Sequence, residues 1–113
     1  MISIYHNNRC SKSRDSLAIL NEQNIDFKVI EYLQNPPTAK QLKTILKKLK
    51  IKPYELIRKS EVLFKTEYKD KDLSDDEWIE VMVNNPVLIE RPIIVNGNKA
   101  VIGRPPEKIL EIL

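Results

Sequence analysis

The single cysteine of this chain, Cys10, lies where a predicted strand, residues 2–5, gives way to a predicted helix that begins at Ser11. A helix N-terminus carries about half a positive charge and unpaired backbone N–H groups, which favour a thiolate and can also hold an anion. Because the thiolate is the nucleophilic form of cysteine, this placement predicts a reactive Cys10 whose pKa is lowered.

The alternative for Cys10 is an inert buried thiol, because free cysteine behaves as a small hydrophobic residue. Its neighbours Arg9, Ser11 and Lys12 are polar or basic. They favour an exposed, electropositive setting, and we therefore prefer the reactive interpretation.

Ser13 follows Cys10 by three residues, which gives a Cys-x-x-Ser motif after a strand. This is the placement of a thioredoxin-type redox motif whose second cysteine is replaced, so redox chemistry at Cys10 requires an external thiol. His6 precedes Cys10 by four residues. It either tunes the thiol and orders the loop, or it is a surface histidine at a strand end.

Three arginines stand at the predicted boundaries of elements: Arg58, Arg91 and Arg104. A guanidinium group is always charged, and its planar fork of donors suits an oxyanion. If the fold brings the three together near Cys10, they would bind a tetrahedral anion and stabilise negative charge as it moves. For any one arginine alone, a solvated salt bridge is the ordinary alternative.

The elements that must position these residues begin with a βαβ unit. Residues 2–5 and 25–30 are predicted strands, and residues 11–23 form the helix between them, with Asn24 as its stop signal. Strands joined by such a crossover are parallel.

Two capping boxes, Thr38 with Gln41 and Ser74 with Glu77, mark the starts of two further helices. The first of these carries apolar residues at helical spacing: Leu42, Ile45, Leu46 and Leu49. Pro53 suits the first turn of a short helix. The mostly charged residues 61–73 are predicted to be irregular.

Residues 92–95 and 99–102 are predicted strands that flank Asn96-Gly97, a strong signal for a hairpin. Residues 105–113 are predicted to form a final helix with three apolar residues on one side: Ile109, Leu110 and Leu113. The predicted fold is therefore α/β, with a four-stranded mixed sheet flanked by helices. It carries a helical insert at about residues 38–83, in a single domain of residues 1–113.

Composition limits the classes of function. The chain has 113 residues, a net charge of +3, one cysteine and one histidine, so an internal disulfide is excluded and a conventional metal site is not expected. There is no signal peptide pattern and no apolar run of about 20 residues. We expect a soluble, cytoplasmic protein that binds neither membrane nor nucleic acid, and we interpret the lysines of residues 40–52 as a solvated helix face.

Several motifs together resemble the glutaredoxin-dependent arsenate reductase family over nearly the full length. They are Tyr5-His6-Asn7, Cys10-Ser11-Lys12-Ser13-Arg14, Tyr32-Leu33, Pro36-Pro37-Thr38, Leu56-Ile57-Arg58-Lys59, Leu88-Ile89-Glu90-Arg91-Pro92-Ile93 and Gly103-Arg104-Pro105. The resemblance implies a thioredoxin-like fold with an inserted helical subdomain. It also implies a cis peptide bond between Arg91 and Pro92.

By this resemblance Cys10 attacks arsenate, and Arg58, Arg91 and Arg104 bind the oxyanion. His6 matches a residue that influences the thiolate, and Ser13 matches a serine that hydrogen-bonds the sulfur. Glutathione is the implied co-substrate, with no bound cofactor, and glutaredoxin is the implied partner that removes glutathione from Cys10.

Two alternatives of the same fold stay open: a glutathione-dependent thiol reductase, and an Spx-like transcription regulator that binds RNA polymerase. Spx regulators typically carry Cys-x-x-Cys, and Ser13 argues against that interpretation. Asn8 stands where many arsenate reductases of this type carry proline, so a looser loop before Cys10 is expected.

Overall fold

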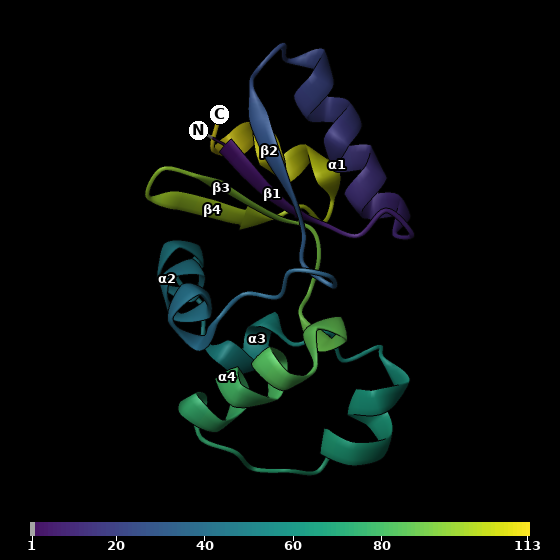
Figure 1. The fold of residues 1–113 in the computed structure, drawn as a ribbon, viewed down its shortest axis with the longest axis vertical. Helices are drawn as coiled ribbons and strands as arrows, with labels where there is room; N and C mark the ends of the chain where they lie inside the picture. The colour runs from purple at the N-terminus through teal and green to yellow at the C-terminus, as the bar shows by residue number, and fades with distance from the viewer. Residues whose placement is uncertain (1) are drawn as a thin grey trace. The chain divides into compact units, whose positions relative to one another are not determined.

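The computed structural model describes residues 2–113, which form two compact units (Figure 1). The first unit contains residues 2–35 and 91–113, and the second contains residues 36–90. The predicted helical insert falls inside the second unit. That the whole chain behaves as a single domain stays a prediction.

The first unit is built on a four-stranded sheet with the strand order β2-β1-β3-β4. Its strands are β1 (Ile2–His6), β2 (Phe27–Glu31), β3 (Ile93–Asn96) and β4 (Lys99–Ile102). β1 is parallel to β2 and antiparallel to β3, and β3 and β4 form an antiparallel hairpin. The mixed sheet is as predicted, with strand ends shifted by one or two residues.

The core of this unit lies between the sheet and two helical segments, α1 (Ser11–Glu22) and the 3₁₀ helix η3 (Pro106–Glu111). Six buried residues form it: Ile2, Ile4, Leu20, Ile94, Ile109 and Ile112. α1 ends as predicted near Asn24, whose φ of 54° is the left-handed conformation that commonly follows a helix. This packing holds the carboxyl end of β1 against the start of α1.

The C-terminal segment corrects the prediction of a helix over residues 105–113 with Leu110 and Leu113 on its inner side. The structure has a 3₁₀ helix of six residues, and the two leucines are exposed. Ile109 is buried as predicted, and Ile112 is buried in place of the two leucines. A 3₁₀ helix has three residues per turn, so positions three apart share a face.

The hairpin is confirmed, but its turn lies one residue later than Asn96-Gly97. Asn96 still pairs with Lys99, so the two loop residues are Gly97 and Asn98. Gly97 has a φ of 61°, which glycine adopts without the steric cost that a Cβ would bring.

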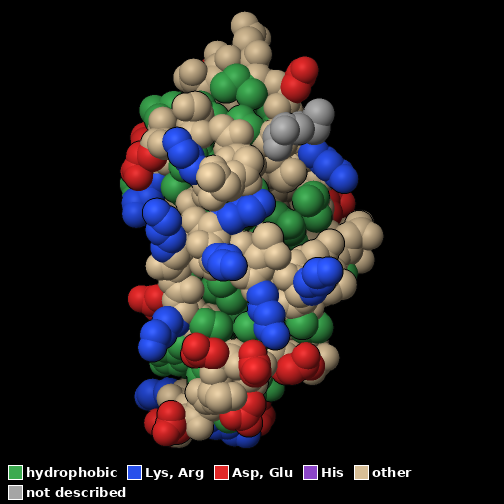
Figure 2. All heavy atoms as spheres, turned by 90° about the vertical axis from the view of Figure 1, so that its left-hand side faces the viewer, with side chains coloured by type: hydrophobic (Ala, Val, Ile, Leu, Met, Phe, Trp, Pro, Cys, Tyr) green, Lys and Arg blue, Asp and Glu red, His purple; other side chains and the backbone are tan. Residues whose placement is uncertain are grey.

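The second unit is helical. It contains α2 (Ala39–Leu49), α3 (Pro53–Leu56), a π-helix η1 (Phe64–Tyr68), α4 (Asp75–Asn84) and a 3₁₀ turn η2 (Pro86–Leu88). Both predicted capping boxes are present at the starts of α2 and α4. The α2 lysines are mostly exposed, and basic and acidic side chains both occur on the face seen in Figure 2. Their exposure agrees with the predicted solvated helix face.

The prediction that residues 61–73 are irregular is wrong for residues 62–68, which are helical and include η1. Although the segment is mostly charged, it contains a buried aromatic residue, Phe64, which is 4% exposed. The Phe64 ring lies near the Trp78 ring, with 6.4 Å between ring centroids. Tertiary packing on this aromatic ring thus stabilises helical turns that the sequence pattern alone does not indicate.

Candidate functional site

Cys10 lies at the position predicted for it, as the N-cap residue of α1. The loop that carries it is tight, because the Cys10 N–H donates to the Asn7 carbonyl at 3.0 Å. The Cys10 carbonyl in turn accepts from the Arg14 N–H at 3.1 Å, the first turn of the helix. The sulfur therefore stands at the positive end of the α1 dipole.

The prediction of an exposed Cys10 is wrong, because the residue is only 8% exposed. Arg9, Ser11 and Lys12 are themselves exposed, as their sequence suggests. The buried thiol still has charged surroundings, because arginines from the far end of the chain approach its sulfur.

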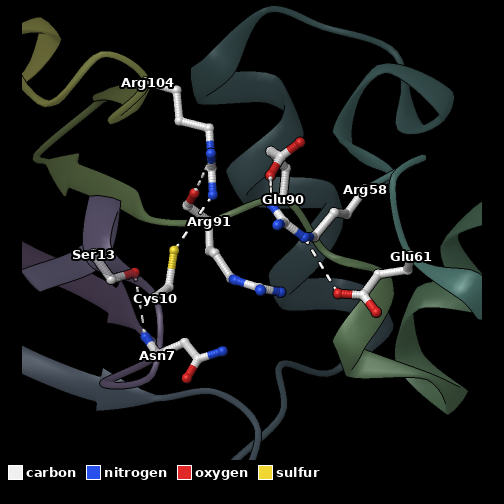
Figure 3. Close-up of polar contacts among 8 residues, drawn as sticks. All are labelled: Asn7, Cys10, Ser13, Arg58, Glu61, Glu90, Arg91 and Arg104. Atoms are coloured by element: carbon white, nitrogen blue, oxygen red, sulfur yellow. Dashed lines mark hydrogen bonds and ion pairs between the residues drawn. The ribbon is translucent and has the colours of Figure 1, made fainter.

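Arg104 contacts the sulfur directly. Its Nη2 donates to the Cys10 Sγ at 3.4 Å, and its Nε donates to the Arg91 carbonyl at 2.6 Å (Figure 3). Residues about ninety positions apart in the chain thus meet where the end of β4 lies near the start of α1. The guanidinium is held by one bond to the backbone and presents another donor to the nucleophile.

The pKa of the Cys10 thiol is lowered from its ordinary value, although burial by itself raises it. The Ser13 backbone N–H, the Arg91 side chain, the Lys12 backbone N–H and the charge of Arg104 together outweigh burial. The direction is as predicted, but the charged groups responsible are Arg91 and Arg104. The helix N-terminus, on which the prediction rested, contributes through the backbone N–H groups of Ser13 and Lys12, whereas the charges of Arg9 and Lys12 are not among the causes.

Arg91 is half-buried beside the same sulfur. Burial acts against its charged form, but the Cys10 sulfur and the Tyr32 phenol outweigh burial and raise the pKa of Arg91 above its ordinary value. Tyr32 is 1% exposed and follows β2. Tyr32 belongs to the Tyr32-Leu33 motif of the family resemblance, which was the signal in the sequence, but no role was predicted for it.

Gly103 permits the approach of β4 to α1. A Cβ added at Gly103 would lie 2.8 Å from the Ser16 Oγ and 3.0 Å from the Pro92 Cγ, which is too close for real atoms. The Gly103 N–H also donates to the Pro92 carbonyl at 2.9 Å. The Arg91–Pro92 peptide bond is cis, as the resemblance implied, and so is Arg104–Pro105.

His6 ends β1 and is 5% exposed, so it is not a surface histidine. Burial lowers its pKa, and the charge of Glu31 opposes that effect in part. Its Nδ1 has no hydrogen-bond partner among residues 2–113. The imidazole is therefore mainly neutral at neutral pH.

Ser13 is fully buried in the first turn of α1. Its hydroxyl oxygen accepts from the Asn7 N–H at 3.4 Å, while its own backbone N–H helps to lower the pKa of Cys10. Ser13 thus links the loop before Cys10 to the helix after it.

Arg58 belongs to the second unit and has different partners. Its Nη1 donates to the Glu90 Oε1 at 2.9 Å, and its Nε donates to the Glu61 Oε1 at 3.2 Å (Figure 3). The backbone there is fixed by the bond from the Arg58 N–H to the Leu88 carbonyl, at 2.7 Å. That Arg58 takes part in the Cys10 site stays a prediction from its motif.

Among residues 2–113 no group of three His, Cys, Asp or Glu side chains could hold a metal ion. No helix in the same range is long and apolar enough to cross a membrane.

A parallel β1-α1-β2 unit, an antiparallel hairpin and a cysteine at the N-terminus of α1 define a thioredoxin-like fold with a thiol site. The family model that matches residues 5–112 is the ArsC family, and the chain belongs to this family. Its relatives include the arsenate reductase of Haemophilus influenzae, 44% identical over 99% of this chain and 98% of that protein.

Another relative is the uncharacterized protein YfgD of Escherichia coli, 46% identical over 99% of this chain and 96% of that protein. Among solved structures, the arsenate reductase from Vibrio cholerae is similar with a TM-score of 0.94 and 44% identity. That alignment covers 99% of this chain and 97% of the other. The sequence resemblance and the predicted fold class are thus confirmed.

Proposed function

We propose that this protein reduces arsenate to arsenite, with Cys10 as the nucleophile and with glutathione and glutaredoxin as the source of electrons. The observation that carries the proposal is the Arg104 Nη2 donor 3.4 Å from the Cys10 Sγ. Arg104 and Arg91 both lie beside the Cys10 thiol, and both help to lower its pKa. Arsenate reductases among the relatives support the choice of substrate.

In the first step the Cys10 thiolate attacks the arsenic of arsenate. A sulfur–arsenic bond forms and an oxygen leaves as hydroxide or water. The guanidinium groups of Arg91 and Arg104 bind the oxyanion and stabilise the negative charge that moves onto it. Arg58 is proposed as a third anion-binding residue on the strength of its motif.

In the second step a glutathione thiolate attacks the Cys10 sulfur. A disulfide bond forms between Cys10 and glutathione, and the electron pair of the sulfur–arsenic bond stays on arsenic, which falls from +5 to +3 and leaves as arsenite. A glutaredoxin thiolate then takes the glutathione and frees Cys10. Since the chain has one cysteine, no internal thiol can replace these partners.

Two further residues have proposed supporting roles. Neutral His6 orders the loop that carries Cys10, and Ser13 holds the start of α1 in the geometry that directs its N–H groups toward the sulfur. A reducing, cytoplasmic compartment, which keeps Cys10 as a thiol, fits this chemistry.

The test is a coupled assay of the purified protein with arsenate, glutathione, glutaredoxin and recycling by NADPH. Arsenate-dependent consumption of NADPH is expected. If there is none, but a Cys10–glutathione disulfide forms and is reduced by glutaredoxin, the thiol-reductase alternative replaces the proposal. Specific capture of RNA polymerase subunits by an inactive protein would favour the regulator alternative.

A further inference from the structure

A cavity of about 330 Å³ lies at the carboxyl end of the parallel pair β1 and β2, and nothing in the proposed function uses it. It is lined by residues 6–9, at and after the end of β1, and by Glu31, Leu33 and Gln34, at and after the end of β2. All of these residues belong to the first unit. The volume is in the range of small-ligand pockets, about 300–1,000 Å³, and strand ends of this kind are common binding positions in α/β folds.

The cavity contains a buried polar atom without a partner. His6 is 5% exposed, lines the cavity and leaves its Nδ1 without a hydrogen bond to any residue from 2 to 113. Buried polar atoms in proteins are nearly always satisfied, so this nitrogen is available to a group bound in the cavity. A neutral imidazole can offer either a donor or an acceptor at this nitrogen.

The same cavity carries one charge of each sign. Arg9 and Glu31 both line it, and neither makes an ion pair with a residue in the part of the chain that the structure describes. The Arg9 backbone is held in place, because its N–H donates to the Asn7 Oδ1 at 3.0 Å. A guanidinium and a carboxylate that line the same cavity fit a zwitterion better than a simple anion.

The residues that line the cavity include Arg9, the neighbour of the nucleophile in the chain. Cys10 directly follows Arg9, and its N–H is bonded to the Asn7 carbonyl, so the loop that lines the cavity is the loop that presents the sulfur (Figure 3). A tripeptide spans up to about 10 Å when extended. To react with Cys10, a ligand anchored by one end in the cavity has to extend its thiol to that sulfur.

We propose that this cavity binds the γ-glutamyl end of glutathione, an inference that rests on the proposed function. That end carries an ammonium and a carboxylate on one carbon. Glu31 accepts from the ammonium, Arg9 donates to the carboxylate, and His6 hydrogen-bonds the same end through Nδ1. The anchored thiolate then attacks Cys10 in the second step described above.

The test uses glutathione disulfide, which needs no arsenate. The Cys10 thiolate attacks one of its sulfurs, a Cys10–glutathione disulfide forms, and one glutathione thiolate leaves. The rate for wild-type protein is compared with the rate for 2-hydroxyethyl disulfide, which undergoes the same exchange but has no charged groups. The ratio of the two rates isolates recognition of the zwitterion from reactivity of the thiol.

Arg9→Gln and Glu31→Gln are each expected to lower this ratio about fivefold, the effect of losing one solvent-accessible ion pair. Arg14→Gln and Glu22→Gln remove the same charges from exposed positions on α1 outside the cavity and should leave the ratio unchanged. S-methylglutathione, which cannot exchange disulfides, should slow the wild-type reaction with glutathione disulfide but not that of the two cavity variants.

An unchanged ratio in the cavity variants would overturn the cavity proposal, whether both rates stay the same or both fall equally. So would a wild-type protein that does not prefer glutathione disulfide. Circular dichroism checks that each variant is folded. The coupled arsenate assay of wild-type protein judges the proposed function separately, because the disulfide ratios do not depend on arsenate.

Discussion

Arg104 in the first unit and Arg58 in the second both belong to motifs of the family resemblance, but their side chains have different kinds of hydrogen-bond partner. Arg104 donates to a sulfur and to a backbone carbonyl, and its charge helps to lower the pKa of Cys10. Arg58 is ion-paired with two carboxylates, Glu61 and Glu90. The surroundings of a guanidinium, more than its presence in a motif, decide whether it activates a thiol.

Cys10→Ser is the change with the largest expected effect. A hydroxyl is a much weaker nucleophile at neutral pH and cannot form the disulfide with glutathione, so arsenate reduction should fall by a factor on the order of 10³ or more. The coupled assay measures this. Activity retained by a folded Cys10→Ser protein would remove the basis of the comparison, because Arg104 would then have no nucleophile to activate.

Arg104→Ala and Arg91→Ala should each lower kcat/KM by about 10²–10³, the usual cost of losing one donor to a developing oxyanion. Both should also raise the pKa of Cys10, since both arginines lower it in the wild-type protein. Alkylation rates measured against pH report that pKa. Arg→Lys variants should recover part of the activity only, because an ammonium lacks the planar fork.

Arg58→Ala tests the difference between Arg58 and Arg104. We expect kcat/KM for arsenate to fall by roughly tenfold, less than for Arg104, because two carboxylates already compensate the charge of Arg58. The pH dependence of Cys10 alkylation should not move. If the Cys10 pKa rises as much as in Arg104→Ala, the two arginines act alike and the contrast is wrong. A thermal melt serves as the control for folding.

Ser13→Ala should reduce activity only a few-fold. The hydroxyl accepts from the Asn7 N–H at 3.4 Å, and a hydrogen bond of this kind is worth about 1 kcal/mol. The Ser13 backbone N–H, which lowers the Cys10 pKa, remains in the variant. A loss as large as that of Arg104→Ala would mean that the hydroxyl acts on the sulfur directly.

The smallest expected effect concerns the contribution of His6 to the pH dependence of stability. Its pKa in the folded state is lowered, so the unfolded chain binds more protons in the range below about pH 6.5. The free energy of unfolding should therefore fall as pH decreases from about 6.5 toward the folded pKa. Denaturant unfolding at pH 7.5 and 5.5 measures this, and His6→Asn should show a smaller decrease between those pH values.

The local features were predictable because their signals lie within a few residues of each other. The capping boxes at Thr38 and Ser74, the hairpin around Gly97 and the N-cap position of Cys10 are each specified by neighbours in the chain. The resemblance also identified the family. Even there, element boundaries moved by a residue or two, and the C-terminal segment took a 3₁₀ helix because Ile109 and Ile112 pack into the core.

Local sequence signals therefore specify the order of most elements, the helix N-terminus that receives the thiol, and the residue types available to it. The burial of Cys10 depends on the folded structure, and so does the finding that Arg91 and Arg104, rather than Arg9 and Lys12, are the charged residues at its sulfur. The reason is physical. Local hydrogen bonds and helical periodicity act over a few residues, whereas burial and Coulomb interactions depend on distances in space that chain separation does not encode.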